Sequence, residues 1–501
     1  MAAAASVPTV QKRRLYIGSG RQRAVRALAI HRHPHRTGTI SWFALAMMTV
    51  GSVGYLGSAP ALAVFGLASV FLYVLPAIVF LLPVALVAAE LASGWEGGVY
   101  NWVQQGMSAP LGMVAVWCQF AQTIFYYPAL LAYVGGTLAY VIDQHLATSG
   151  VYTGVVIVVL FWASVLVSSR GRGLVARLAS GGTLIGTLLP ATILVGLGIA
   201  YLAQGHHSAA PISTHHLLPA WNGLAGIVLI INSFFTYAGV EANAGHVDEL
   251  ENPGREFPRA MFVASLVVLA VFVFPTLAIS SIIPSAKISL TSGVMQAFDG
   301  LLSHFGLHFA VPIIAVALAV GALAGMMAWL DGPSEGLLRI GREQGYLPPY
   351  FQQVDHEGIQ LRILAAQGVV ITIIGLLYAL IPQVSSAYWI LATLATQVYL
   401  IMYVLMFIAA VRLHRKQRDH PRGYHAPALV LLCGLGGLAS IAAFAIGFVP
   451  PAQLSHVASP AVYALLIIVG ILLIGVLPPL VLEWRRKPHW KTATQPERSS
   501  A

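Results

Sequence analysis

The sequence has few charged residues and few cysteines. Of its 501 residues only 9% are Asp, Glu, Lys or Arg, whereas 58% are hydrophobic. A soluble globular domain carries about 25% charged residues, so this composition excludes one. The two cysteines, Cys118 and Cys433, both lie in apolar runs and are too few for a disulfide framework or a cysteine-rich metal site. The composition indicates instead one polytopic membrane domain.

The motifs of several enzyme classes are also missing. The chain has no Walker loop and no His-Glu-x-x-His sequence. Without a Walker loop, a pump driven by its own ATPase is not expected, and we expect no enzyme. The histidines near 31–35 and 206–216 lie in loop segments, which supply a defined metal shell poorly, so no metal site is predicted. The first 36 residues form a basic tail rather than a signal peptide, which would need an apolar run.

Apolar runs of a length that can cross a bilayer dominate the rest of the chain. They predict twelve spans, near 39–60, 65–91, 112–142, 151–169, 175–203, 223–247, 259–284, 309–338, 362–382, 386–411, 426–449 and 460–483.

The basic residues fall on one side of these spans. With the N-terminus inside, all of the 27 Lys and Arg residues except Lys287 would be cytoplasmic, as the positive-inside rule requires. We therefore expect a multi-pass protein of the plasma or bacterial inner membrane with both termini in the cytoplasm. The net charge of +10 then reflects topology and attraction to anionic lipid rather than nucleic acid. Charges at span ends, such as Glu90 and Arg259, are expected to form solvated ion pairs.

This topology divides the chain into a basic cytoplasmic N-terminal tail (1–36), a twelve-helix domain (37–485) and a short cytoplasmic C-terminal tail (486–501).

Two spans contain matched interruptions. The first carries Gly51 and Gly54, and the sixth carries Gly239 beside the acidic Glu241. A carboxylate inside a span is costly and marks a functional site. A helix that breaks there exposes backbone groups, which is tolerated only where they line a cavity. Breaks five spans apart predict an inverted repeat of five plus five helices, although glycines can also serve close helix packing.

Three sequence blocks carry a resemblance to a known family. Residues 83–103 contain Ala-Glu-Leu-Ala and Gly-Gly-Val-Tyr-Asn-Trp, residues 237–260 contain Glu-Leu-Glu-Asn-Pro-Gly-Arg, and residues 329–349 begin Trp-Leu-Asp-Gly-Pro-Ser-Glu. Over residues 41–422 the chain resembles the amino acid–polyamine–organocation superfamily, in particular its glutamate/γ-aminobutyrate antiporter branch. The resemblance implies a leucine-transporter-like, all-α membrane fold that exchanges amino acids by alternating access without a metal or organic cofactor. The sequence departs from that branch at Gly57 and Val64, where an arginine and an acid are typical.

The two interruptions provide the candidate substrate site. A half-helix N-terminus carries partial positive charge, which suits an α-carboxylate, whereas carbonyl groups suit an α-ammonium. We expect the first role of Gly51, Ser52, Val53 and Gly54, and the second of Tyr237, Ala238 and Gly239.

Five further side chains complete the candidate site. Glu241 is interpreted as a proton carrier, a counter-charge for an amine, or a strut between the broken halves. The resemblance places a gating aromatic residue at Trp329; an interfacial tryptophan is the alternative. Tyr399 and Tyr403 are four residues apart and share a helix face; similar tyrosines line the family's pathway, although packing is the alternative. Tyr126 belongs to a polar set in span three, with Gln119, Gln122 and Tyr127, of which one or two should face the cavity.

These observations predict a secondary active transporter of an amino acid or a related amine. Transport would proceed by alternating access, either by exchange or with proton coupling, and the substrate would lie near the membrane midplane between spans one, three, six, eight and ten. The expected partners are the small-molecule substrate, membrane lipid and protons. A membrane receptor that binds an amino acid without transporting it is the alternative function.

Overall fold

A computed structural model describes residues 40–53, 55–95, 97–171, 181–182, 184–220, 223–380, 383–452 and 459–492 of the chain. Within these residues the secondary structure is helical and contains no strand. Eleven helices are long and apolar enough to cross a membrane, and one bent pair makes a twelfth span. The predicted basic tail, 1–36, and the last residues of the C-terminal tail lie outside the described residues.

The spans follow the order predicted from the sequence, which confirms the fold class. Spans one to six are Trp42–Gly51 with Leu56–Ala63, Gly66–Gly94, Ala109–Ile142, Gly150–Ser168, Ile185–Ala203 and Leu224–Ala242. Spans seven to twelve are Pro253–Ile282, His308–Gln344, Leu361–Tyr378, Val384–Lys416, Leu429–Ile446 and Pro460–Arg485.

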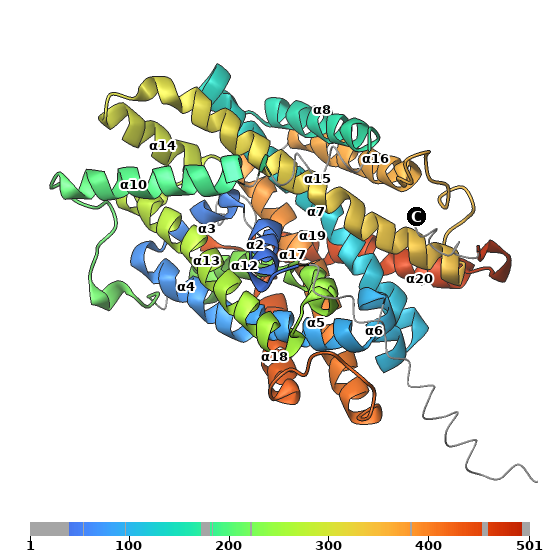
Figure 1. The fold of residues 1–501 in the computed structure, drawn as a ribbon. Coiled ribbons are helices and arrows are strands. Elements are labelled where there is room, and N and C mark those ends of the chain that lie inside the picture. Colours follow the sequence, from blue (N-terminus) through green and yellow to red (C-terminus); the bar gives the residue numbers. More distant parts are fainter. Residues whose placement is uncertain are drawn as a thin grey trace, which may run out of the picture.

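The broken segments lie in the middle of the bundle. In Figure 1, α12 (Ile231–Tyr237) lies next to α17 (Val384–Lys416), and α2 (Trp42–Val53) packs against α13 (Pro253–Ile282). The helices α8 (Gly150–Ser168) and α16 (Leu361–Tyr378) run side by side at one edge. Two long helices, α7 (Ala109–Ile142) and α15 (Val311–Gln344), pass the centre. Each has 34 residues, about 51 Å at 1.5 Å per residue. They therefore exceed a hydrocarbon core of about 30 Å and must tilt or extend beyond it.

The first span breaks after α2 ends at Val53. Tyr55 is extended, with φ −148° and ψ 113°, and a 3-10 turn from Leu56 to Ser58 leads into α3 (Ala59–Ala63). The two halves meet at an angle of 50°. Gly51 is thus still helical, and α2 continues through Val53, the third residue of the Gly51–Gly54 stretch in which the sequence predicted the break. Gly54 itself lies outside the described residues.

The sixth span breaks where it was predicted to break. After α12 ends at Tyr237, Ala238 is extended, and Gly239 adopts the left-handed region with φ 100°. A 3-10 helix, Val240–Glu249, follows. Because a positive φ is easily adopted only by glycine, Gly239 is the residue that allows the helix to stop and restart here. Breaks in the first and sixth spans agree with the predicted five-plus-five repeat.

Glu90 corrects one expectation of the sequence analysis. It was predicted to be a solvated charge, but its side chain is only 2% exposed and pairs with Arg422, which is 3% exposed. Its second oxygen accepts the N–H of Ala426 at 2.8 Å. Arg422 can reach Glu90 because the segment after α17 folds back across α5 (Leu82–Gly94), where the guanidinium lies over the ring of Trp95. The pair joins α5 to the α17–α18 connection.

Candidate functional site

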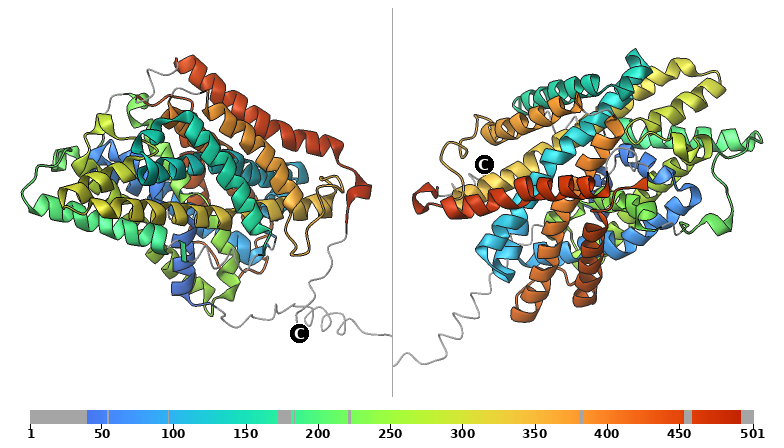
Figure 2. Two further views of the ribbon diagram at one scale, coloured as in Figure 1. Left: turned by 90° about the horizontal axis from the view of Figure 1, so that it is seen from above. Right: turned by 180° about the vertical axis from the view of Figure 1, so that it is seen from behind.

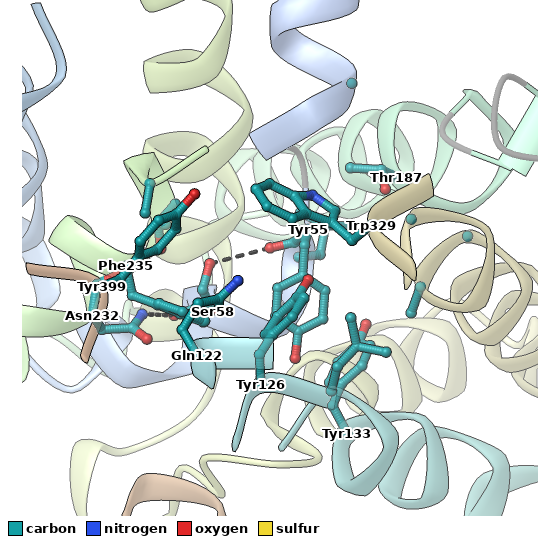
Figure 3. A pocket seen from close by; sticks show the side chains of 18 of the residues that line it. Tyr55, Ser58, Gln122, Tyr126, Tyr133, Thr187, Asn232, Phe235, Trp329 and Tyr399 are labelled. Atoms are coloured by element: carbon teal, nitrogen blue, oxygen red, sulfur yellow. Dashed lines mark hydrogen bonds between the residues drawn. The ribbon is translucent and has the colours of Figure 1, made fainter. Parts of the chain in front are cut away.

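A cavity of about 340 Å³ lies at the first break, between it and spans three, five, six, eight and ten. This volume falls in the range of small-molecule sites, which begin at about 300 Å³. Its polar lining consists mainly of tyrosine hydroxyls and amides (Figure 3). None of the described side chains that line it is charged. The labelled lining residues in Figure 3 are Tyr55, Ser58, Gln122, Tyr126, Tyr133, Thr187, Asn232, Phe235, Trp329 and Tyr399.

One face of α7 supplies much of the polar lining. Gln119, Gln122, Tyr126 and Tyr133 all line the cavity, and their spacings of three, four and seven residues place them on one side of a helix. Tyr127 does not line the cavity; its hydroxyl donates to the carbonyl of Trp329 at 2.9 Å. The polar set predicted in span three therefore divides between the cavity and a contact with α15.

The start of the second half of span one is held by two other spans. The amide of Asn232 in α12 donates to the carbonyl of Ser58 at 2.8 Å. The hydroxyl of Tyr388 in α17 donates to the carbonyl of Gly57 at 3.2 Å. These bonds fix the orientation of the turn that begins at Leu56. The first N–H groups of a helix have no partner within it, so this turn presents backbone donors at the cavity wall.

Glu241 binds two tyrosines of α17 and the backbone of its own break. Its Oε1 accepts from the Tyr399 hydroxyl at 2.5 Å, and its Oε2 accepts from Tyr403 at 2.6 Å and from the N–H of Gly239 at 3.1 Å. Gly239 also donates to the Tyr403 hydroxyl at 2.8 Å. The carboxyl is 2% exposed and does not line the cavity. Glu241 therefore binds the start of the second half-helix and ties it to span ten.

Trp329 brings span eight against the second break. Its indole lies directly against Gly239, where any side chain would overlap the ring. It also lines the cavity, and Figure 3 shows it near Tyr55 and Tyr126, across from Asn232 and Ser58. Trp329 is close to the middle of α15, so its position does not match the interfacial alternative.

The predicted site residues therefore fall into three sets. Those that line the cavity are Gly51, Tyr126, Ala238, Trp329 and Tyr399. Those that do not line it are Tyr237, Gly239, Glu241 and Tyr403; Tyr237 instead donates its hydroxyl to the carbonyl of Tyr73 at 3.0 Å. The side chains of Ser52 and Val53, and all of Gly54, lie outside what the structure describes.

Several lining residues were not predicted. Tyr55 and Ser58 follow the glycines of span one directly, and Asn232 is an amide inside an apolar run. Tyr388 precedes Tyr399 by eleven residues, about three helical turns, which places both on one face of α17. Each of these residues is polar and lies in a span, so the sequence alone could have marked it as a candidate site residue. Phe235 could not have been identified in this way, since an aromatic residue in an apolar run is ordinary.

Metal binding finds no support in the described part of the chain, where no group of three or more His, Cys, Asp or Glu side chains is placed to hold an ion.

Comparisons with known proteins identify the family. A family model described as amino acid permease matches residues 40–473. An uncharacterized transporter of Legionella pneumophila is 33% identical over 84% of this chain and 91% of its own length. A glutamate/gamma-aminobutyrate antiporter of Lactococcus lactis is 29% identical over 92% of this chain and 94% of its own. The crystal structure of MhsT in complex with L-phenylalanine has the same fold, with a TM-score of 0.53 and 14% identity over 82% of this chain and 98% of that one. The chain belongs to the amino acid permease family and is a multi-pass membrane transporter.

Proposed function

We propose that this transporter moves an amino acid with an uncharged side chain across the plasma membrane by alternating access, through exchange or proton coupling. The observation that carries the proposal is the cavity between two broken helices, whose described lining is polar but uncharged. The distribution of basic residues supports cytoplasmic termini.

The backbone at the breaks supports binding of a zwitterion. The turn that starts at Leu56 offers N–H groups to a carboxylate. The last carbonyls of a helix also lack partners within it, and the carbonyl ends of α2 and α12 lie near Gly51 and Ala238, which both line the cavity. These carbonyls suit an ammonium group. A small molecule with both charges would thus be held between the two spans.

The side chains around the cavity support an uncharged substrate side chain. Gln119, Gln122 and Tyr126 can donate and accept hydrogen bonds, and aromatic rings surround them. A substrate side chain with a full charge would be desolvated there without a counter-ion, which is costly. Gly57 stands where the antiporter branch typically carries an arginine, and the Glu241 carboxyl is already held by Tyr399 and Tyr403.

The contacts around the breaks suggest how the site would open and close. Trp329 lies between the cavity and Gly239, so a movement of this ring would change access to the substrate. Glu241 would transmit that movement between the second half-helix and α17 through its bonds to both tyrosines. Rocking of one bundle against another around a fixed midplane site is the usual form of alternating access.

Counterflow into proteoliposomes tests the proposal. Vesicles loaded with one unlabelled amino acid would be given the same labelled amino acid outside, across a panel with neutral, acidic and basic side chains and γ-aminobutyrate. We expect accumulation for one or more neutral amino acids and little for glutamate or lysine.

Two other outcomes would count against the proposal in different ways. Accumulation of glutamate or γ-aminobutyrate alone would contradict the substrate class but keep the transporter. Binding of an amino acid to the purified protein without counterflow of any panel member would favour the receptor alternative.

A further inference from the structure

A second cavity, of about 570 Å³, lies on the other side of α7. Trp117, Phe120 and Ile124 line it, on the face of α7 opposite to Gln122 and Tyr126, and it shares no lining residue with the candidate substrate site. The other walls come from α16, from the end of span eight and from α20 (Leu477–Arg485). We call this cavity the C-terminal groove.

The body of the C-terminal groove is apolar. Gln367 is the one amide side chain that lines the groove, and it already donates to the Thr123 hydroxyl at 2.7 Å. Leu473 and Leu477, on the last span, are 57% and 51% exposed, so the groove opens onto the surface that faces lipid. A charged amino acid or a peptide backbone would lose its hydrogen bonds there, whereas a hydrocarbon chain would lose nothing.

The shape of the last span contributes to this groove. Pro478 has no N–H, so the carbonyl of Ile474 lacks its usual helical partner. The span is π-helical from Ile471 to Val476, and the indole N–H of Trp117 donates to that carbonyl at 2.6 Å. This contact holds α7 and the last span together at one wall of the groove.

One end of the C-terminal groove is basic. Arg485 lines it, and Arg486, Lys487 and Lys491 follow within six residues. Arg486 lies 3.8 Å from Glu483, whereas Arg485 has no carboxylate within ion-pair distance among the described residues. Basic clusters beside membrane helices attract anionic headgroups.

The residues at this end are held in place. Gln352, in the loop after α15, donates to the carbonyl of Trp490 at 2.7 Å and accepts from the Thr492 hydroxyl at 2.8 Å. Arg486 donates to the carbonyl of Gln344 at 2.9 Å. Figure 2 shows the red C-terminal helix beside the end of the yellow α15. Trp490 therefore closes the groove at the level of the cations, where tryptophan commonly meets lipid headgroups.

We propose that the C-terminal groove binds an anionic phospholipid of the bilayer. One acyl chain lies along Phe120 and Leu477, and the phosphate lies at Arg485 beside Trp490. The charge of the rim and the lipid-facing opening favour this occupant over a second copy of the chain, which would have to bring its own anion to the same rim.

Thermal unfolding of the purified full-length protein tests this site. The protein in an uncharged detergent would be followed by tryptophan fluorescence while dioleoyl phosphatidylglycerol, dioleoyl phosphatidylcholine or inorganic phosphate is added. We expect a saturable rise in Tm with phosphatidylglycerol, a weaker effect of phosphatidylcholine, and none of phosphate alone, because most of the affinity comes from the buried chain.

Two variants and two matched controls locate the effect. Arg485→Gln should raise the phosphatidylglycerol concentration at half effect about fivefold. This is the loss of affinity expected when one basic residue near an anionic surface is removed. Ala366→Trp, which fills the groove from α16, should raise it by more than about tenfold. Arg415→Gln at the exposed end of α17 and Val369→Trp on the outer face of α16 should leave it unchanged.

Equal responses to the two lipids, or an unchanged response in both Arg485→Gln and Ala366→Trp, would overturn the proposal. Light scattering gives a further check, because conversion of a dimer to a monomer by Ala366→Trp would assign the groove to a second copy instead. Since Arg485→Gln changes an exposed residue, this variant remains informative if Ala366→Trp fails to fold.

Discussion

The Tyr399 hydroxyl donates to Oε1 of Glu241 at 2.5 Å, and this bond joins two spans that are 158 residues apart in the chain. Tyr403, one turn further along α17, bonds the other carboxyl oxygen. A carboxyl buried in a membrane protein is expensive unless its oxygens are satisfied. Here both oxygens are satisfied, and the satisfied group caps the half-helix that follows Gly239. The break in span six is thus held against span ten by these hydrogen bonds.

Removing one side of this contact should slow transport. Hydrogen bonds to charged groups contribute about 1.5–3 kcal/mol, so Tyr399→Phe and Glu241→Gln should each lower the initial rate of counterflow about tenfold or more. Tyr378→Phe is the matched control, because the buried Tyr378 hydroxyl has no hydrogen-bond partner among the described residues. Wild-type rates in Glu241→Gln at every value from about pH 5 to pH 8 would remove Glu241 from the mechanism.

A side chain at Gly239 should stop transport. Gly239→Ala would place a Cβ in a backbone with φ 100° and against the Trp329 indole, at a cost of about 1–2 kcal/mol for the backbone alone. Gly336→Ala in α15 is the control, because nothing lies within 4 Å of the position its Cβ would take. Equal counterflow in the two variants would show that the break tolerates a side chain and that the indole contact is incidental.

The buried Glu90–Arg422 pair should be important for stability. Removing one partner leaves a buried charge without compensation, which typically costs about 3–5 kcal/mol, so Glu90→Gln and Arg422→Gln should each lower the midpoint of denaturant unfolding in detergent. The double variant should recover part of the loss. For comparison, His246→Ala at the partly exposed His246–Glu249 pair should cost less than about 1 kcal/mol. Additive losses at Glu90 and Arg422 would mean that the two side chains act independently.

The Asn232–Ser58 bond should matter for substrate affinity. Asn232 joins the two spans that carry the breaks, so Asn232→Ala should raise the KM for counterflow several-fold, in line with a loss of about 1 kcal/mol. Ser233→Ala removes a neighbouring bond to the carbonyl of Leu72, away from the cavity, and should leave KM unchanged. A fall in maximal rate with unchanged KM would place Asn232 in the conformational change rather than in the binding of substrate.

Much of the fold could be predicted because the bilayer limits the choices. The span lengths and the break at Gly239, beside Glu241, could be predicted from the sequence, since both follow from the cost of polar groups in lipid. The exact break in span one was not predicted, because Gly51 lies within a helix that continues to Val53. Glycine allows such a break but does not fix its position.

The side chains of the site were harder to predict for a different reason. A lone polar residue in an apolar run indicates a partner inside the protein but does not say which one. Glu241 and Tyr403 bond to each other and do not line the cavity, whereas Asn232 does line it. Glu90 became buried only because Arg422, distant in sequence, folds back to meet it. Pairings of this kind depend on tertiary contacts that periodicity does not contain.

Thiol labelling of Ala238→Cys tests the central claim most directly, namely that the substrate lies between the two broken helices. Ala238 lines the cavity and is partly exposed, whereas the native Cys118 and Cys433 are buried, so the wild-type protein should give little background. A saturating concentration of an amino acid that passes the counterflow test should slow labelling of Ala238→Cys by a water-soluble reagent, while labelling of Ser303→Cys on the exposed side of α14 (Gly293–His304) stays the same. Labelling of Ala238→Cys at one rate with and without the transported amino acid would contradict the account.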